Sequence, residues 1–145
     1  MPHIENAVES FFRTYERNIN SGDMAVLAAQ FADVFFAVGP QGAKSVRASD
    51  FAVALPKRKQ LFDSLGCQST SLVALSPAAL GGRYILVRTQ WKMTFGCSRG
   101  ESQEVLADSL FIVDSGNDEF KIIFYLACQD IMEILKERGI APGTA

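Results

Sequence analysis

The start of the chain carries apolar side chains at spacings of three and four, which is the period of a helix with one buried face. These positions are Ile4, Val8, Phe11, Phe12, Tyr15 and Ile19. Ser21-Gly22 predicts the end of this helix, and Asp23 predicts the start of a shorter one, because an acidic side chain suits the positive end of a helix. A third helical pattern covers 50–65, where Pro56 either kinks the helix or starts a new one.

After this third helix the apolar period shortens to two, which indicates strands. In 84–95 one face carries Val87, Thr89, Trp91 and Met93, and the other Arg88, Gln90, Lys92 and Thr94. A strand with one wet face is typical of an antiparallel sheet. The pattern also predicts strands at 34–38, 44–47, 72–75, 104–113 and 120–128, with a loop at 76–82. Asp130, with Glu133 three residues later, predicts the start of a short last helix.

Helices followed by a run of antiparallel strands are the order of an α+β fold. The chain has 145 residues, so we expect one domain over 1–140 and a flexible tail over 141–145. The last two strands are apolar on both faces, and a bare face would be a large exposed apolar patch. We therefore expect a homodimer formed sheet to sheet. The side chains expected to meet the second copy are Leu106, Leu110, Ile112, Phe124, Leu126 and Cys128.

Charge and composition exclude several partners. A net charge of −2 and a pI of about 5.4 give no field that would hold a nucleic acid. The longest apolar run, 122–128, is far shorter than the ~20 residues that span a bilayer, and residues 1–10 lack the apolar core of a signal peptide. Cys67, Cys97 and Cys128 form neither a disulfide framework nor a redox pair. These features predict a reducing, cytoplasmic setting without a membrane partner.

Two stretches resemble the nuclear transport factor two-like superfamily, which includes ketosteroid isomerases, SnoaL-like polyketide cyclases and scytalone dehydratase. The first runs from Tyr15 through Asn20-Ser21-Gly22-Asp23 to Phe31-Ala32-Asp33, and resembles the family's long helix, its break and its short second helix. The second is the late strand pair from Trp91 to Val113. The resemblance covers about 4–139. It implies a cone-shaped, curved antiparallel sheet wrapped around the long N-terminal helix, the cystatin-like α+β barrel, with a pocket at the wide end.

The isomerases of this superfamily need a carboxylate base and two hydrogen-bond donors for an oxyanion. The resemblance places the first donor on Tyr15, the base near Gly39, which has no side chain, and the second donor near Ser109. Asp108 is next to Ser109 and faces the opposite way in a regular strand. Isomerisation by that mechanism is therefore disfavoured. Asp33 has the sequence position of a structural residue at a helix-to-strand corner.

The other activities of the superfamily also lack their groups. SnoaL-like cyclases and scytalone dehydratase resemble each other in using histidine with aspartate, but the one histidine, His3, lies at the N-terminus before the first clear helical turn. Limonene epoxide hydrolase uses an Asp-Arg-Asp arrangement, which would need a β-bulge that turns Asp108 inward near Arg83 or Arg88. One histidine and three scattered cysteines make no metal site, and no cofactor motif is present.

A pocket hypothesis remains. Regular alternation turns toward the cone the side chains of Tyr15, Phe36, Trp91, Ser109, Tyr125 and Gln129. We expect a mostly apolar pocket that binds a small hydrophobic molecule, because a buried phenol needs a partner. The alternative is a non-catalytic homodimeric interaction domain whose cone is filled by Phe and Trp. A further alternative is an isomerase, cyclase or dehydratase that uses Asp33 or Asp108 as its base. An open cavity in the cone would distinguish the first two.

Overall fold

The computed structural model describes residues 2–96, 102–116 and 119–140. Its helices are α1 (Pro2–Ser21), α2 (Met24–Ala28), α3 (Ala48–Ser64) and α4 (Ile131–Glu137). Its strands are β1 (Phe31–Gly39), β2 (Gly42–Arg47), β3 (Cys67–Gly81), β4 (Tyr84–Phe95), β5 (Gln103–Asp114) and β6 (Lys121–Ala127). The tail predicted at 141–145 lies outside the described residues. None of the helices in the described ranges is long and apolar enough to cross a membrane.

The strands form one curved sheet in the order β2-β1-β6-β5-β4-β3, and the α+β class is confirmed. Neighbouring strands are antiparallel except β1 and β6, which run parallel. The curved, mostly antiparallel sheet agrees with the prediction from the sequence. The one parallel pair arises because a long crossover, and not a hairpin, connects β1 to β6. β2 and β3 are free edges, so the sheet is curved but not closed into a barrel.

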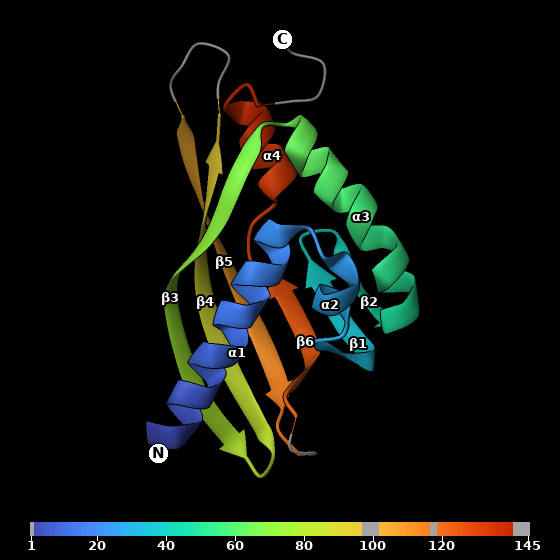
Figure 1. Ribbon diagram of the computed structural model, residues 1–145, viewed down its shortest axis with the longest axis vertical. Coiled ribbons are helices and arrows are strands. Elements are labelled where there is room, and N and C mark those ends of the chain that lie inside the picture. The colour runs from blue at the N-terminus through green and yellow to red at the C-terminus, as the bar shows by residue number, and fades with distance from the viewer. Residues whose placement is uncertain (1, 97–101, 117–118, 141–145) are drawn as a thin grey trace.

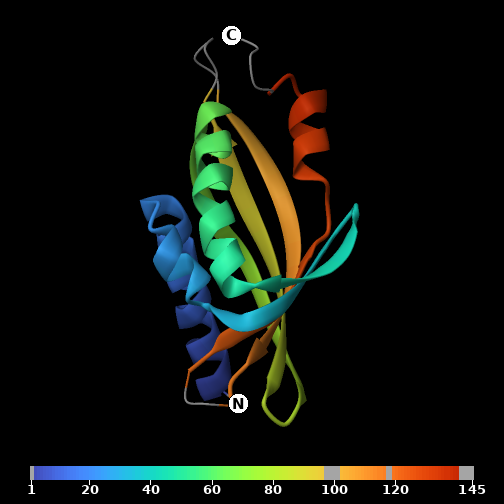
Figure 2. The same ribbon diagram turned by 90° about the vertical axis from the view of Figure 1, so that its right-hand side faces the viewer.

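The helix α1 lies across one face of the sheet, here called the inner face, with α2 and α3 beside it (Figure 1). Figure 2, turned by 90°, shows α1 and α2 on one side of the strands. The apolar stripe of α1 places Val8, Phe12 and Tyr15 in the core, together with inward residues of the strands. Burial of this apolar surface is the main favourable term for the fold.

A second apolar cluster covers the end of the sheet where α4 lies (Figure 1). Leu135 of α4 is fully buried there, among residues that α3, β4 and β5 contribute. Asp130 caps α4, since its carboxylate accepts a hydrogen bond from the Glu133 N–H at 3.1 Å, as the sequence predicted. The C-terminal helix is thus fixed at both its cap and its buried face.

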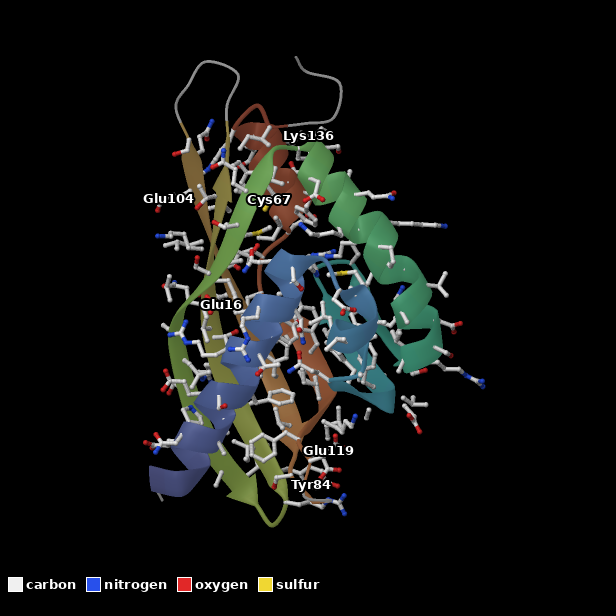
Figure 3. The ribbon with its side chains drawn as sticks, viewed as in Figure 1. Glu16, Cys67, Tyr84, Glu104, Glu119 and Lys136 are labelled. Carbon is white, nitrogen blue, oxygen red and sulfur yellow. The ribbon has the colours of Figure 1, made fainter. Side chains whose placement is uncertain are left out.

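Side chains of α1 bind the free edge of β3. The Glu16 carboxylate accepts a hydrogen bond from the Leu72 N–H at 2.7 Å, and Arg13 Nη1 donates to the Leu72 carbonyl at 3.2 Å. Asn20 accepts from the Thr70 N–H at 2.9 Å and donates to its carbonyl at 2.8 Å. Figure 3 shows Glu16 where α1 passes β3. These bonds satisfy backbone groups that an edge strand otherwise leaves unpaired.

The loop predicted at 76–82 is wrong, because these residues form most of the second half of β3. They pair with β4 as far as Gly81, opposite Tyr84. The long ladder of β4 supplies a partner that outweighs their poor strand propensity. Pro77 is tolerated because β3 is an edge strand. The Leu72 N–H points to the free edge, where it bonds to Glu16, and the pairing with β4 turns the Pro77 nitrogen to the same edge, so no ladder bond is lost.

Helix boundaries also differ from the pattern. α1 begins at Pro2 and includes His3, which the sequence placed before the helix. Pro56 lies inside α3 and does not start a new helix. Phe31, predicted on the second helix, opens β1. The prediction that Asp23 starts α2 is confirmed, since its carboxylate accepts a hydrogen bond from the Val26 N–H at 3.3 Å.

Candidate functional site

Tyr15 lies on α1 with its ring against the inner face of the sheet and only 8% of its surface exposed. Its ring centroid is 5.5 Å from that of Trp91 on β4 and 5.6 Å from that of Phe111 on β5. Tyr125 of β6 packs against Phe111 at 5.1 Å. Trp91 and Tyr125 therefore point inward, as the alternation predicted, and aromatic rings from three strands and α1 share the interior.

The polar atoms of this interior are bonded to one another. The Trp91 indole Nε1–H donates to Thr89 Oγ1 at 2.8 Å, and the Thr89 hydroxyl donates to the Ser109 carbonyl at 3.3 Å. Thr89 and Ser109 are buried and lie opposite each other in the β4–β5 ladder. Ser109 is thus on the inner face, as predicted, and the indole N–H has its partner within the protein.

The Tyr15 hydroxyl is the exception among these polar atoms. It makes no hydrogen bond to a described residue. In those ranges every side-chain oxygen that is fully buried has a hydrogen-bond partner, so the Tyr15 hydroxyl is not fully buried and water can reach it. Burial raises the pKa of Tyr15 far above its usual value, Tyr125 raises it further, and the positive charge of Arg58 on α3 opposes them. The phenol is therefore a neutral hydrogen-bond donor near pH 7.

The two candidate bases are not directed into this interior. Asp33 is exposed on β1. Asp108 lies on the outer face of β5, opposite Gln90, in a β4–β5 ladder whose register has no shift from Tyr84 to Phe95. The β-bulge that would turn Asp108 inward is absent from this pairing. With a glycine at position 39, the described residues bring no carboxylate to the Tyr15 hydroxyl to take a proton from a substrate.

Two predicted pocket residues do not face the interior. Gln129 is bonded at both ends to Asp108, because its Nε2 donates to Asp108 Oδ2 at 2.7 Å and its Oε1 accepts from the Asp108 N–H at 2.7 Å. Phe36 is 44% exposed on the outer face, and Phe35 is buried in its place. Since 34–38 is apolar at every position, the alternation there has no preferred phase, and the prediction for Phe36 chose the wrong one.

Two hollows stand out in the described part of the chain, and both open on the surface. The larger, of about 300 Å³, lies on the outer face and is lined by Ala74, Ser76, Arg88, Gln90 and Asp108, among others. The smaller, of about 160 Å³, lies between α1 and β3. Neither is lined by Tyr15, Trp91 or Tyr125. Neither hollow therefore lies in the interior that was expected to hold a ligand.

The outer face of the sheet, opposite α1, carries neighbouring apolar side chains from β1 through β6 and β5 to Leu86 of β4. Cross-strand pairing places Phe36 beside Phe124, Ile112 and Leu86 in one row, and Val38 beside Leu126 and Leu110 in the next. Leu106 extends the face and is 51% exposed. The outer apolar face comprises Val34, Phe36, Val38, Leu86, Leu106, Leu110, Ile112, Phe124 and Leu126. A contiguous apolar patch of this kind marks a contact surface.

Sequence reasoning missed one charged residue near the interior and gave no metal site. Arg58 lies 4.9 Å above the Phe62 ring and its charge acts on the Tyr15 hydroxyl, although the sequence shows it only as the centre of a basic run on a helix. Its neighbourhood depends on how α3 packs, which no local pattern reports. Within the described ranges, no group of three or more His, Cys, Asp or Glu side chains is placed to hold a metal ion.

No protein-family model matches the sequence, and no curated protein matches it. Among solved structures, Aln2 from a Streptomyces species has a TM-score of 0.76 over 94% of this chain and 97% of its own, at 11% identity. An NTF2-like protein with a cystatin-like fold from Novosphingobium aromaticivorans has a TM-score of 0.70 over 86% and 80%, at 11% identity. A proposed calcium/calmodulin-dependent protein kinase II association domain from Xanthomonas campestris has 0.66 over 86% of each chain, at 11% identity. These likenesses show the fold alone.

Proposed function

We propose that this chain, whose fold is the NTF2-like, cystatin-like one, is a non-catalytic interaction domain that forms a homodimer through its outer apolar face. The observation that carries the proposal is the continuity of that face across β1, β6, β5 and β4. An ordinary protein interface buries about 800 Å² on each partner. Covering the face with a second copy removes its apolar surface from water, which is the dominant favourable term in association.

The interior supports the same proposal. Trp91 and Phe111 fill the space next to Tyr15, and the indole N–H is already bonded to Thr89. No carboxylate in the described ranges accompanies the Tyr15 hydroxyl. One structural neighbour is itself a proposed association domain, so the fold also serves in proteins that assemble. An interior that is packed and lacks an acid–base pair is expected of a domain whose contact surface is its function.

Substitution of exposed apolar residues tests the proposal. Phe36→Glu places a charge on the outer apolar face, where the present side chain is 44% exposed, so the change is tolerated by the monomer. Val53→Glu is the matched control, because Val53 is 68% exposed on α3. Sedimentation velocity should give a dimer for the wild type and for Val53→Glu, and a monomer for Phe36→Glu. Equal masses for the two variants would contradict the assignment of the face.

A second candidate function is binding of a small apolar molecule with a hydrogen-bond acceptor, as in the pocket hypothesis. The observation that favours it is the Tyr15 hydroxyl, a neutral donor without a partner among the described residues. Binding would require the rings of Trp91 and Phe111 to move apart. The one tryptophan reports on this directly: a small apolar ketone should shift its emission in the wild type and not in Tyr15→Phe. An emission unchanged by the ketone would exclude this candidate.

The proposal includes the setting and the extent of the domain. We assign residues 1–140 to one domain in a reducing, cytoplasmic environment. Half-buried Cys67 and exposed Cys128 are free thiols, as such an environment requires. Burial raises the pKa of the Cys67 thiol, so this side chain is a poor nucleophile.

A further inference from the structure

Two opposite charges border the outer apolar face where β4 and β5 pair. Arg88 of β4 lies opposite Leu110, and Asp108 of β5 lies opposite Gln90, so the two charged residues occupy diagonal positions on the same face. They do not form an ion pair. In the described part of the chain, no carboxylate lies within 4.0 Å of the Arg88 guanidinium. Each charge is therefore available to a partner.

The Asp108 carboxylate is held in a fixed position. Gln90 Nε2 donates to its Oδ1 at 3.1 Å and Gln129 Nε2 donates to its Oδ2 at 2.7 Å. The same Gln129 amide accepts from the Asp108 N–H, so the side chain of Gln129 is itself anchored. Each carboxylate oxygen can accept more than one hydrogen bond, so both oxygens keep capacity for another donor. A carboxylate fixed in this way suits the two parallel donors of a guanidinium.

Space for that donor lies beside Asp108. The larger hollow, of about 300 Å³, is lined by Asp108 and Arg88 and by the small residues Ala74 and Ser76 of β3. These small side chains leave room above the sheet that larger ones would fill. A guanidinium from outside the chain can reach the carboxylate there without displacing any described residue.

We propose that the occupant of this hollow is Arg88 of a second copy of the chain, which binds the Asp108 carboxylate across the interface. The inference rests on the proposed homodimer and names the contact that fixes its register. A two-fold axis that bisects the line between Arg88 and Asp108 creates the contact twice, because each subunit supplies one cation and one anion. An unrelated partner would need to supply both charges in the matching arrangement, whereas a second copy has them already.

Burial makes this pairing necessary in such a dimer. An apolar surface that covers Arg88 removes its charge from water, and a buried charge without a partner is strongly unfavourable. Arginine also carries a planar fork of donors that matches a carboxylate, so the pair sets geometry as well as charge. The apolar side chains supply the association, and the charge pair selects one relative orientation of the two sheets.

Charge exchange between two variants tests the contact. Arg88→Asp leaves two acids on each subunit, and Asp108→Arg leaves two bases. Each variant alone should dimerise with a Kd raised roughly tenfold or more, because truncation of a buried charge pair costs at least that. An equal mixture should form a heterodimer of about wild-type strength, since both cross-contacts are then restored. Native mass spectrometry distinguishes heterodimer from homodimers by mass.

A control pair of the same charge change separates this contact from general charge attraction. Asp50 and Lys57 are exposed on α3, away from the outer face, so Lys57→Asp and Asp50→Arg should each dimerise as the wild type does. Single variants that dimerise like the wild type, or a mixture that stays monomeric, would overturn the inference while leaving the homodimer intact. A wild type that is itself monomeric would instead refute the proposed function.

Discussion

The Trp91 indole N–H donates a hydrogen bond at 2.8 Å to the hydroxyl of Thr89, two residues earlier on the same inner face of β4. The bond is local to one strand, so it forms whether or not a ligand is present. It gives a partner to the one polar atom of the Trp91 side chain, and Trp91 is only 5% exposed. Trp91 is therefore a core residue whose donor is not left for a substrate.

Replacement of this side chain should reduce stability rather than open a useful pocket. Trp91→Ala should lower the free energy of unfolding by about 3–5 kcal/mol, the usual cost of deleting a large aromatic side chain from a packed core. Trp91→Phe keeps most of the ring and should cost less. Urea unfolding followed by circular dichroism measures both. A Trp91→Ala protein of wild-type stability that binds larger apolar ligands would show that the interior is a binding site.

The bond from the Leu72 N–H to Glu16 should contribute measurably, because it ties α1 to the edge of the sheet. Glu16→Ala should lower the free energy of unfolding by about 1–3 kcal/mol, and Glu16→Gln, which keeps an acceptor, by less. Glu9→Ala is the control, since Glu9 pairs with Arg13 only at 3.8 Å in solvent and should cost less than about 1 kcal/mol. Hydrogen exchange at the Leu72 amide should accelerate in Glu16→Ala alone.

Stability should fall in alkali through Tyr15. Because burial raises the pKa of Tyr15, the folded chain holds the phenol proton more tightly than the unfolded chain does. This contribution is intact below the ordinary tyrosine pKa of about 10 and decreases as the pH rises above it. Tyr15→Phe lacks the titrating group, so its stability should decline less between about pH 9 and 11. Parallel curves for the two proteins would show that burial does not raise the pKa of Tyr15.

The wild type should not isomerise a 3-oxo-Δ5 steroid, because no carboxylate accompanies Tyr15 in the described ranges. Gly39→Asp should raise turnover above the blank, since β1 turns position 39 to the same side as Ala37 and no atom lies within 4 Å of a Cβ added there. A well-placed general base contributes about 10²–10⁴-fold. Gly39→Asn has the same size without a base and should stay at the blank. Wild-type turnover that Asp33→Asn or Asp108→Asn abolishes would identify a base elsewhere.

The sequence predicted the parts of the fold that follow from local periodicity. In β4, polar Arg88 and Gln90 alternate with apolar Val87 and Trp91. This alternation predicted both the strand and the face to which each side chain points. Residues 34–38 have no polar position, so the same reasoning could not choose between Phe35 and Phe36. The second half of β3 exists because β4 pairs with it, and its own composition indicates a loop.

The candidate site was predictable only in part for the same reason. The resemblance marked Tyr15, and alternation correctly turned Trp91, Ser109 and Tyr125 toward it. Whether the cone is open or filled depends on the distances between rings of different elements, such as the 5.5 Å between Tyr15 and Trp91, which no sequence period encodes. The engagement of Gln129 with Asp108 likewise depends on where β6 ends beside β5.

The molar mass in solution tests the central claim most directly, because the outer apolar face has no other assigned role. Multi-angle light scattering on the wild-type chain at high micromolar concentration should give twice the 15.8 kDa of one chain. Dilution should lower this mass toward that of the monomer, as mass action requires. A single species of 15.8 kDa at high micromolar concentration would contradict the account.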